Sequence, residues 1–318
     1  MELRNRIVPR APKTPAQGPE TNVTSWWQKG HLVYHHFHEV DLYLQDNDFI
    51  LTGYRMNYTF RESFISVFHL HNEWMNVWTH LLGMCHFAWL VYTSLHADIH
   101  SNARWEDRYM IVMVLACATY TLLCSSLFHL HICVNENAFR WFGCLDYSGI
   151  SALIFGGSAV YAHFILYCDP IAQRSSIILM MLVSLVGIVG PMYPSWRGPK
   201  FRVGRAAVYL SSVFASTLPI IYYLSVYGWT ALPDWHHNFA IPGTLLMAVQ
   251  FFVGAFIYSL RIPEKWLPGF FDIFGASHQI WHILVWSATT TLHLCILWVN
   301  QALLGFMDWR MEAGQCLQ

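Results

Sequence analysis

Residues 109–131 read YMIVMVLACATYTLLCSSLFHLH, a run with no lysine, arginine, aspartate or glutamate. A helix needs about 20 mainly apolar residues to cross the hydrocarbon core of a bilayer. The run is long enough, so it predicts a membrane-spanning helix. Its last turns also carry Ser125 and His129. These polar side chains are unexpected in a segment that would lie in the apolar interior of a membrane.

Comparable apolar runs occur along the rest of the chain. Together they are 75–96, 109–131, 140–167, 175–194, 204–227, 240–260 and 278–304. We therefore predict an all-α fold, a seven-transmembrane helical bundle, and a multi-pass integral membrane protein of the plasma membrane or an endomembrane. Pro191, Pro219 and Pro242 fall near the ends of these runs or at kinks that neighbouring helices can tolerate.

The composition disfavours other classes of protein. Of the 318 residues, 55% are hydrophobic and only 12% are charged, whereas soluble domains carry about 25% charged residues. The net charge of −1 gives no basic field for nucleic acid. The eight cysteines include no Cys-x-x-Cys pair. We therefore predict that they are small core residues, and we predict no disulfide framework.

The distribution of basic residues predicts the orientation. Cytoplasmic loops of membrane proteins carry an excess of lysine and arginine. With seven spans, most basic residues fall in the N-terminal segment and in the second, fourth and sixth loops. The opposite side has only Arg104, Arg108, Arg174 and Arg310. The N-terminus is therefore predicted to be cytoplasmic and the C-terminus extracellular or lumenal. The glycosylation sequons at Asn22 and Asn57 would then stay unmodified.

Four segments follow from this orientation. Residues 1–40 are predicted to be a disordered, basic or interfacial N-terminal segment. Residues 41–74 are a cytoplasmic lead-in, 75–304 are the seven-helix domain and 305–318 are an extracellular tail.

Five polar side chains are predicted to meet in one layer at the cytoplasmic end of the bundle. Ionisable groups inside spans are costly and usually face the bundle interior. The layer would hold Ser125 and His129 from the second span, Asp146 from the third, and His278 and His282 from the seventh. Both pairs are spaced i, i+4, so each pair projects from one face of its helix.

Three imidazoles from two helices match a catalytic zinc site, which uses three protein ligands and keeps one position open. The predicted metal ligands are His129, His278 and His282. Asp146 would hold a water molecule and accept its proton, and Ser125 would orient a ligand or the substrate.

A second interpretation of these histidines stays open. A histidine in a membrane helix often forms a hydrogen bond with a neighbouring group, and this chain has 18 histidines. We assign His86, His163 and His293 to that structural role because they fall at other depths.

Several motifs surround the predicted site in a fixed order. They are DNDFILTGYR at 46–55, FHLHNE at 68–73, NVWTHLLG at 76–83, SSLFH at 125–129, LDYSGI at 145–150, RIPEK at 261–265 and SHQIWH at 277–282. From about residue 40 to about residue 304, the chain resembles the progestin and adipoQ receptor family. It is most similar to the haemolysin-III-related branch of adiponectin receptors and plant heptahelical proteins.

The resemblance implies zinc ligands at His129, His278 and His282, a water-holding acid at Asp146 and a helper serine at Ser125. It also implies an adiponectin-receptor-like membrane protein whose zinc site hydrolyses a lipid amide such as ceramide. The expected partners are a ceramide-like membrane lipid and an extracellular ligand of unknown identity.

Two rival functions remain at this stage. One is a signalling receptor in which zinc is structural. The other is a transporter, although transporters usually place their polar groups near the midplane of the membrane. Glu73, Asn76 and His80 share the depth of the predicted site, where they would surround or gate it, or only pack and cap the helix.

Overall fold

The computed structural model describes residues 32–96, 105–193, 196, 202–231 and 236–312. Residues 33–318 belong to one compact unit. The described residues are helical apart from turns, loops and one isolated bridge between His35 and Tyr54. The all-α prediction is therefore confirmed for this part of the chain.

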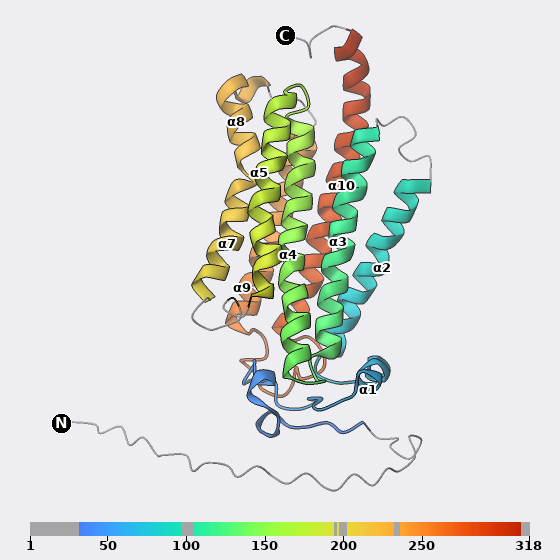
Figure 1. The fold of residues 1–318 in the computed structure, drawn as a ribbon, viewed down its shortest axis with the longest axis vertical. Coiled ribbons are helices and arrows are strands. Elements are labelled where there is room, and N and C mark those ends of the chain that lie inside the picture. Colours follow the sequence, from blue (N-terminus) through green and yellow to red (C-terminus); the bar gives the residue numbers. More distant parts are fainter. Residues whose placement is uncertain (1–31, 97–104, 194–195, 197–201, 232–235, 313–318) are drawn as a thin grey trace, which may run out of the picture. The chain divides into compact units, whose positions relative to one another are not determined.

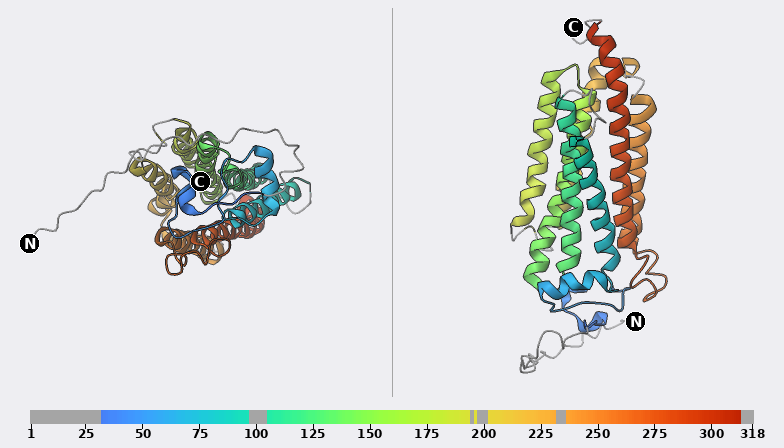
Figure 2. Two further views of the ribbon diagram at one scale, coloured as in Figure 1. Left: turned by 90° about the horizontal axis from the view of Figure 1, so that it is seen from below. Right: turned by 90° about the vertical axis from the view of Figure 1, so that its right-hand side faces the viewer.

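The long helices run side by side along the bundle (Figure 1). They are α2 (Trp74–His96), α3 (Trp105–His131), α4 (Glu136–Ile165), α5 (Pro170–Val189), α7 (Arg202–Ala215), α8 (Leu218–Tyr227), α9 (Ile241–Leu260) and α10 (Ser277–Glu312). Of these, α7 and α8 follow one another end to end. The short helix α1 (Phe60–Ile65) lies across one end of the bundle (Figure 2, right). Single turns lie at Phe37–Glu39, Leu42–Leu44, Ser66–Phe68, Gly190–Met192, Trp229–Ala231 and His236–Ala240.

Six helical segments among the described residues are long and apolar enough to cross a membrane. They are Trp105–His131, Glu136–Ile165, Pro170–Met192, Ala207–Tyr227, Ile241–Leu260 and Ser277–Val299. The protein is thus a multi-pass integral membrane protein. Helix α2 covers the first predicted run and packs against α3 and α10. It has 23 residues, but its Asn, Thr and His side chains make it less apolar than the six.

Helix ends follow local sequence signals. Asn135 caps α4 by accepting a hydrogen bond from Ala138 N, and Asp169 caps α5 in the same way through Ala172 N. The predicted run 204–227 is divided into α7 and α8, and Pro219 lies in the first turn of α8. Proline has no N–H to donate, so it interrupts a helix interior but is tolerated in a first turn.

Small residues let α3 and α4 approach closely. A Cβ on Gly149 would lie 3.0 Å from Thr121 Cα, and one on Gly156 would lie 3.0 Å from Cys117 Cβ. Close backbone approach through small residues is a general device of membrane helix packing. Thr121 Oγ1 donates a hydrogen bond to the Gly149 carbonyl at 2.8 Å, which fixes the register of the two helices.

The N-terminal prediction needs a correction where the structure describes it. Residues 1–31 lie outside the described residues. Residues 33–40, predicted as part of a disordered or interfacial segment, are instead folded against the lead-in. Phe37 and Val40 are buried in one apolar cluster with Leu44, Ile50 and Tyr54. The burial of these side chains explains why the segment is ordered.

The predictions for the C-terminal tail and for one cysteine also need correction. The tail predicted from residue 305 continues α10 as far as Glu312, and 313–318 lie outside the described residues. Cys168 is disulfide-bonded, so the prediction that the cysteines are unpaired core residues is wrong for it. The prediction is right for the buried Cys124 and Cys133.

Candidate metal centre

Three histidines from two helices meet at the end of the bundle where the lead-in lies. His129 comes from the last turn of α3, and His278 and His282 come from the first two turns of α10. One ring nitrogen of each histidine lies within 4.8 Å of the other two. His129 and His282 are buried and His278 is half-buried. The predicted convergence of these side chains is confirmed.

The spacing of the nitrogens suits a metal ion. The Nε2 atoms of His129 and His278 are 3.2 Å apart. Two nitrogens bound to one tetrahedral zinc ion at about 2.0–2.1 Å would be about 3.3 Å apart. This pair therefore has the spacing of two ligands of one small cation, and with His282 nearby the three residues could hold a metal ion through neutral imidazoles.

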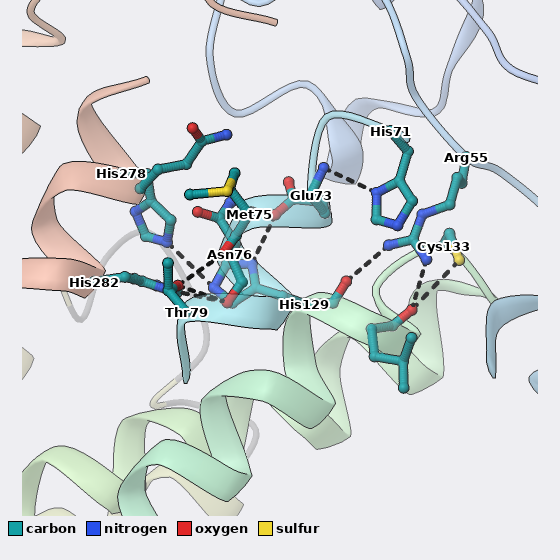
Figure 3. A network of polar contacts seen from close by, with 12 residues as sticks. Arg55, His71, Glu73, Met75, Asn76, Thr79, His129, Cys133, His278 and His282 are labelled. Atoms are coloured by element: carbon teal, nitrogen blue, oxygen red, sulfur yellow. Dashed lines mark hydrogen bonds and ion pairs between the residues drawn. The ribbon is translucent and has the colours of Figure 1, made fainter. Parts of the chain in front are cut away.

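The Nδ1 atoms of His129 and His282 lie next to oxygen atoms at the start of α2 (Figure 3). His129 Nδ1 lies 2.8 Å from Glu73 Oε2. His282 Nδ1 lies 3.2 Å from the Asn76 carbonyl and 3.4 Å from Thr79 Oγ1. Because a carboxylate and a carbonyl only accept, the proton in each ring belongs on Nδ1, which leaves Nε2 free to bind a metal.

Glu73 is held as an anion. Burial by itself would raise the pKa of its carboxyl group, but the hydrogen bonds from His129 and Asn76 outweigh burial and lower the pKa to about 2. Asn76 Nδ2 donates to Glu73 Oε2 at 2.6 Å. A negative charge therefore lies beside the three imidazoles at neutral pH.

Asp146 and Ser125 lie beside the cluster. The Asp146 carboxylate on α4 interacts with the Ser125 hydroxyl and is within electrostatic range of His129. Ser125 is buried, one helical turn before His129 on α3. The five residues chosen from the sequence thus occupy one neighbourhood, in which α4 supplies the acid.

The end of α3 is secured from the lead-in. Arg55 is buried and its Nη2 donates to the His129 carbonyl at 2.8 Å. Its Nη1 donates to the Leu130 carbonyl at 3.2 Å and to Ser66 Oγ at 2.6 Å. The last carbonyls of a helix have no partner within the helix, and the Arg55 guanidinium donates to two of them, with Ser63 Oγ as a second donor to the Leu130 carbonyl.

The start of α10 is secured by two carboxylates of the preceding loop. Glu264 is fully buried and accepts hydrogen bonds from Ser277 N at 2.8 Å and from Asn47 Nδ2 at 3.1 Å. Asp272 accepts from Leu51 N at 2.9 Å and from Thr52 N at 2.8 Å. Glu264 thereby joins the lead-in to the helix that carries His278 and His282, and Asp272 ties the loop before that helix to the lead-in.

Sequence reasoning missed part of this support. Arg55 and Glu264 lie inside motifs that carried the family resemblance, but no chemistry was predicted for them. Glu73 and Asn76 were predicted only as neighbours of the site. The structure gives both a direct contact with a candidate ligand.

The remaining histidines assigned to structural roles behave as predicted where their contacts are described. His86 Nδ1 accepts from Trp286 Nε1 at 3.1 Å. His163 Nε2 lies 2.6 Å from Asp107 Oδ1, far from the cluster along α4. His293 is buried.

Comparison with known proteins agrees with the geometry. The profile of the family described as Haemolysin-III related matches residues 68–294. The adiponectin receptor protein of Drosophila melanogaster is 32% identical over 86% of this chain and 61% of its own length, so the chain spans less than two thirds of that relative. Heptahelical transmembrane protein 1 of Arabidopsis thaliana is 32% identical over 87% of this chain and 82% of its own length.

A human relative extends the comparison. Progestin and adipoQ receptor family member 3 of Homo sapiens is 29% identical over 84% of this chain and 84% of its own length. The family profile covers most of the chain and includes every residue of the candidate site. The chain therefore belongs to the haemolysin-III-related family, together with adiponectin receptor, heptahelical transmembrane, and progestin and adipoQ receptor proteins.

Proposed function

We propose that this protein is an adiponectin-receptor-like membrane protein whose histidine cluster binds zinc and hydrolyses a lipid amide of the ceramide type. The observation that carries the proposal is the meeting of His129, His278 and His282 beside Asp146 and Ser125. Three metal ligands with an acid next to them are the components of a hydrolytic metal site, and a structural zinc site usually has four protein ligands.

Zinc is the metal that this donor set favours. Neutral imidazoles suit zinc and other late transition metals, whereas magnesium and calcium prefer oxygen ligands. Zinc would supply Lewis acidity, which polarises a carbonyl group and makes water a nucleophile near neutral pH.

The residues of the chain would carry the proton transfers. Asp146 accepts a proton from water while the water oxygen bonds to the amide carbon. Asp146 then returns that proton to the nitrogen as the carbon–nitrogen bond breaks. The products are a fatty acid and a sphingoid base with a free amine. Ser125 donates a hydrogen bond to Asp146 and holds the carboxylate in place.

The surroundings of the site support a lipid substrate. His129 and His282 are buried between helices that are apolar enough to cross a membrane, so a substrate dissolved in the membrane would start in the phase that surrounds the site. A ceramide-like lipid carries its amide bond close to the membrane surface. We therefore propose this lipid as substrate, and an extracellular ligand of unknown identity as the activating partner.

We also propose seven spans, with α2 as the first and the N-terminus in the cytoplasm. The length of α2 and its packing against α3 and α10 support this count. The metal centre then lies in the inner leaflet. A glycosylation assay in microsomes tests the orientation, because Asn57 lies in the lead-in as part of an Asn-x-Thr sequon. Glycans added there would contradict it.

Turnover by the purified chain tests the enzymatic proposal. Wild-type protein in detergent should release fatty acid from ceramide, and zinc analysis should give about one ion per chain. Asp146→Asn should keep the zinc and lose at least about 100-fold in rate, as expected for removal of a general base. Equal release by the two proteins would exclude Asp146 as the catalytic base.

A receptor with structural zinc is the second candidate. Its support is that the candidate ligands join α3 to α10, so that a bound ion would pin two distant helices together. This function predicts one zinc ion per chain and a large loss of thermal stability on chelation, but no turnover by wild-type protein.

A further inference from the structure

Two of the three candidate ligands are contacted by Glu73, directly before α2, and by Asn76 in its first turn, and neither residue is a candidate ligand itself. Glu73 Oε2 lies 2.8 Å from His129 Nδ1, and the Asn76 carbonyl lies 3.2 Å from His282 Nδ1. His129 and His282 belong to different helices, α3 and α10. The start of α2 therefore contacts both rings through their Nδ1 atoms (Figure 3).

The two contacts have the same chemical consequence. Each places an obligate acceptor at Nδ1, so each ring carries its proton there and presents an unprotonated Nε2. A metal-binding histidine commonly has its other ring nitrogen bound to a carboxylate or a backbone carbonyl, which fixes the tautomer and the ring orientation. Here the carboxylate partner is Glu73 and the carbonyl partner is Asn76, three positions later in the sequence.

Asn76 couples the two contacts. Its side chain donates to the same Glu73 oxygen that faces His129, at 2.6 Å, while its backbone carbonyl faces His282. Glu73 N in turn donates to His71 Nδ1 at 3.1 Å. The Asn76 amide thus holds the Glu73 carboxylate, and the bond to His71 holds the Glu73 backbone.

His80 restrains the His282 ring by stacking against its flat face. Its imidazole stacks on that of His282, with ring centroids 3.6 Å apart and an interplanar angle of 8°. His80 lies one helical turn after Asn76, so the same face of α2 fixes both the edge and the plane of His282. Both rings are buried.

We infer that Glu73 and Asn76 are positioning residues of the metal centre, which fix His129 and His282 as Nδ1-protonated tautomers with Nε2 directed at one cation. This inference rests on the metal binding in the proposed function. It adds that α2, which supplies no ligand, sets the affinity of the site.

Metal affinity of the full-length protein tests the inference independently of turnover. Zinc affinity would be measured by chelator competition in detergent, and the visible absorption bands of bound cobalt(II) would report the ligand field. The variants are Glu73→Ala and Glu73→Gln. The matched control is Glu62→Gln, a half-buried glutamate on α1 whose capping contact with Thr59 a glutamine can also make.

Glu73→Ala should lower zinc affinity by about 10- to 100-fold, the usual effect of losing such a partner, and should shift the cobalt bands. Glu73→Gln keeps a neutral hydrogen-bond acceptor, so it should lose less zinc affinity than Glu73→Ala. Glu62→Gln should bind as wild type does. A merely structural role would lower the stability of the metal-free protein and leave the cobalt spectrum unchanged.

The outcomes separate this inference from the proposed function. Wild-type affinity and an unchanged cobalt spectrum in both Glu73 variants would overturn the positioning role and leave the zinc proposal intact. A folded wild-type protein that binds neither metal would overturn both. If Glu73→Ala does not fold, the nearly isosteric Glu73→Gln decides, because a drop in its affinity is still required.

Discussion

The guanidinium of Arg55 donates a hydrogen bond from Nη2 to the backbone carbonyl of His129, over 2.8 Å. Through this contact a residue of the lead-in holds the turn of α3 that carries a candidate metal ligand. A cation at a helix C-terminus is also favoured by the helix dipole. The lead-in is therefore a structural part of the metal centre, although it lies ahead of the first long helix.

Replacing Arg55 by methionine should destabilise the protein by about 3 kcal/mol. The change removes charge-assisted hydrogen bonds to the His129 and Leu130 carbonyls, and it leaves the buried His129 carbonyl without this donor, whereas the Leu130 carbonyl still accepts from Ser63 Oγ. Thermal unfolding in detergent measures the effect as a lower midpoint. Arg140→Met is the control, because Arg140 is exposed and pairs only with Glu136 on the same helix; exposed pairs of this kind contribute less than about 1 kcal/mol. Equal midpoints for the two variants would contradict the role of Arg55.

Glu264→Ala should weaken both the fold and the metal site. The buried carboxylate accepts from Ser277 N, directly before His278, and from Asn47 of the lead-in. Its loss leaves these donors unsatisfied, at a cost of about 3 kcal/mol, and frees the first turn of α10. We expect a lower unfolding midpoint and weaker zinc binding. The exposed Glu136→Ala should change neither by much, and wild-type zinc affinity in Glu264→Ala would disprove the link to His278.

The ligand set was within reach of sequence reasoning because its signals are local. His278 and His282 are one helical turn apart, Ser125 and His129 repeat that spacing, and span order alone brings the two pairs to one end of the bundle. A histidine in an apolar run also has a structural explanation, so the resemblance to the progestin and adipoQ receptor family was needed to choose a metal site over hydrogen bonding.

The supporting contacts could not be predicted in the same way. The contacts of Arg55 with His129 and of Asn47 with Glu264 join residues that are distant in sequence, and nothing in the local pattern specifies which groups will pair. The folding of Phe37 and Val40 was missed for a related reason. Their apolar partners lie in the lead-in and at the start of α10, and the segment itself has no helical or strand periodicity.

His71 should make the protein less stable in mild acid. Burial, helped by the nearby Arg55 charge, lowers the pKa of His71 to about 2, while an unfolded histidine titrates near about 6.5. Above about pH 6.5 the residue is neutral in both states and contributes no pH dependence. Below it the unfolded chain binds the proton first, so stability falls by up to about 1.4 kcal/mol per pH unit.

The variant His71→Asn isolates this effect. An asparagine oxygen can accept the hydrogen bond from Glu73 N that His71 Nδ1 accepts, but it does not titrate. Between about pH 6.5 and 4.5, the unfolding midpoint of the variant should fall less steeply than that of wild type. The exposed His38→Asn serves as control and should follow wild type. Parallel curves for wild type and His71→Asn would refute the assignment.

Gly149→Ala should reduce turnover while leaving zinc bound. The added Cβ would meet the Thr121 backbone at 3.0 Å, a contact that only a shift of α4 relative to α3 can relieve. Asp146 lies one turn earlier on α4, whereas His129, His278 and His282 lie on α3 and α10. The shift therefore moves the proposed base relative to the ligands, and overpacking of this kind costs about 1–3 kcal/mol.

Gly143→Ala is the matched control for this last test. Gly143 lies as far before Asp146 as Gly149 lies after it, but its added Cβ would meet only the Phe128 ring, at 3.4 Å. Since alanine is the better helix former, this variant should be as stable and as active as wild type. Ceramide release and zinc content, measured on the same preparations, separate the outcomes. Loss of zinc in Gly149→Ala would mean that α3 or α10 moves instead of α4, and full turnover would mean that the position of Asp146 is not critical.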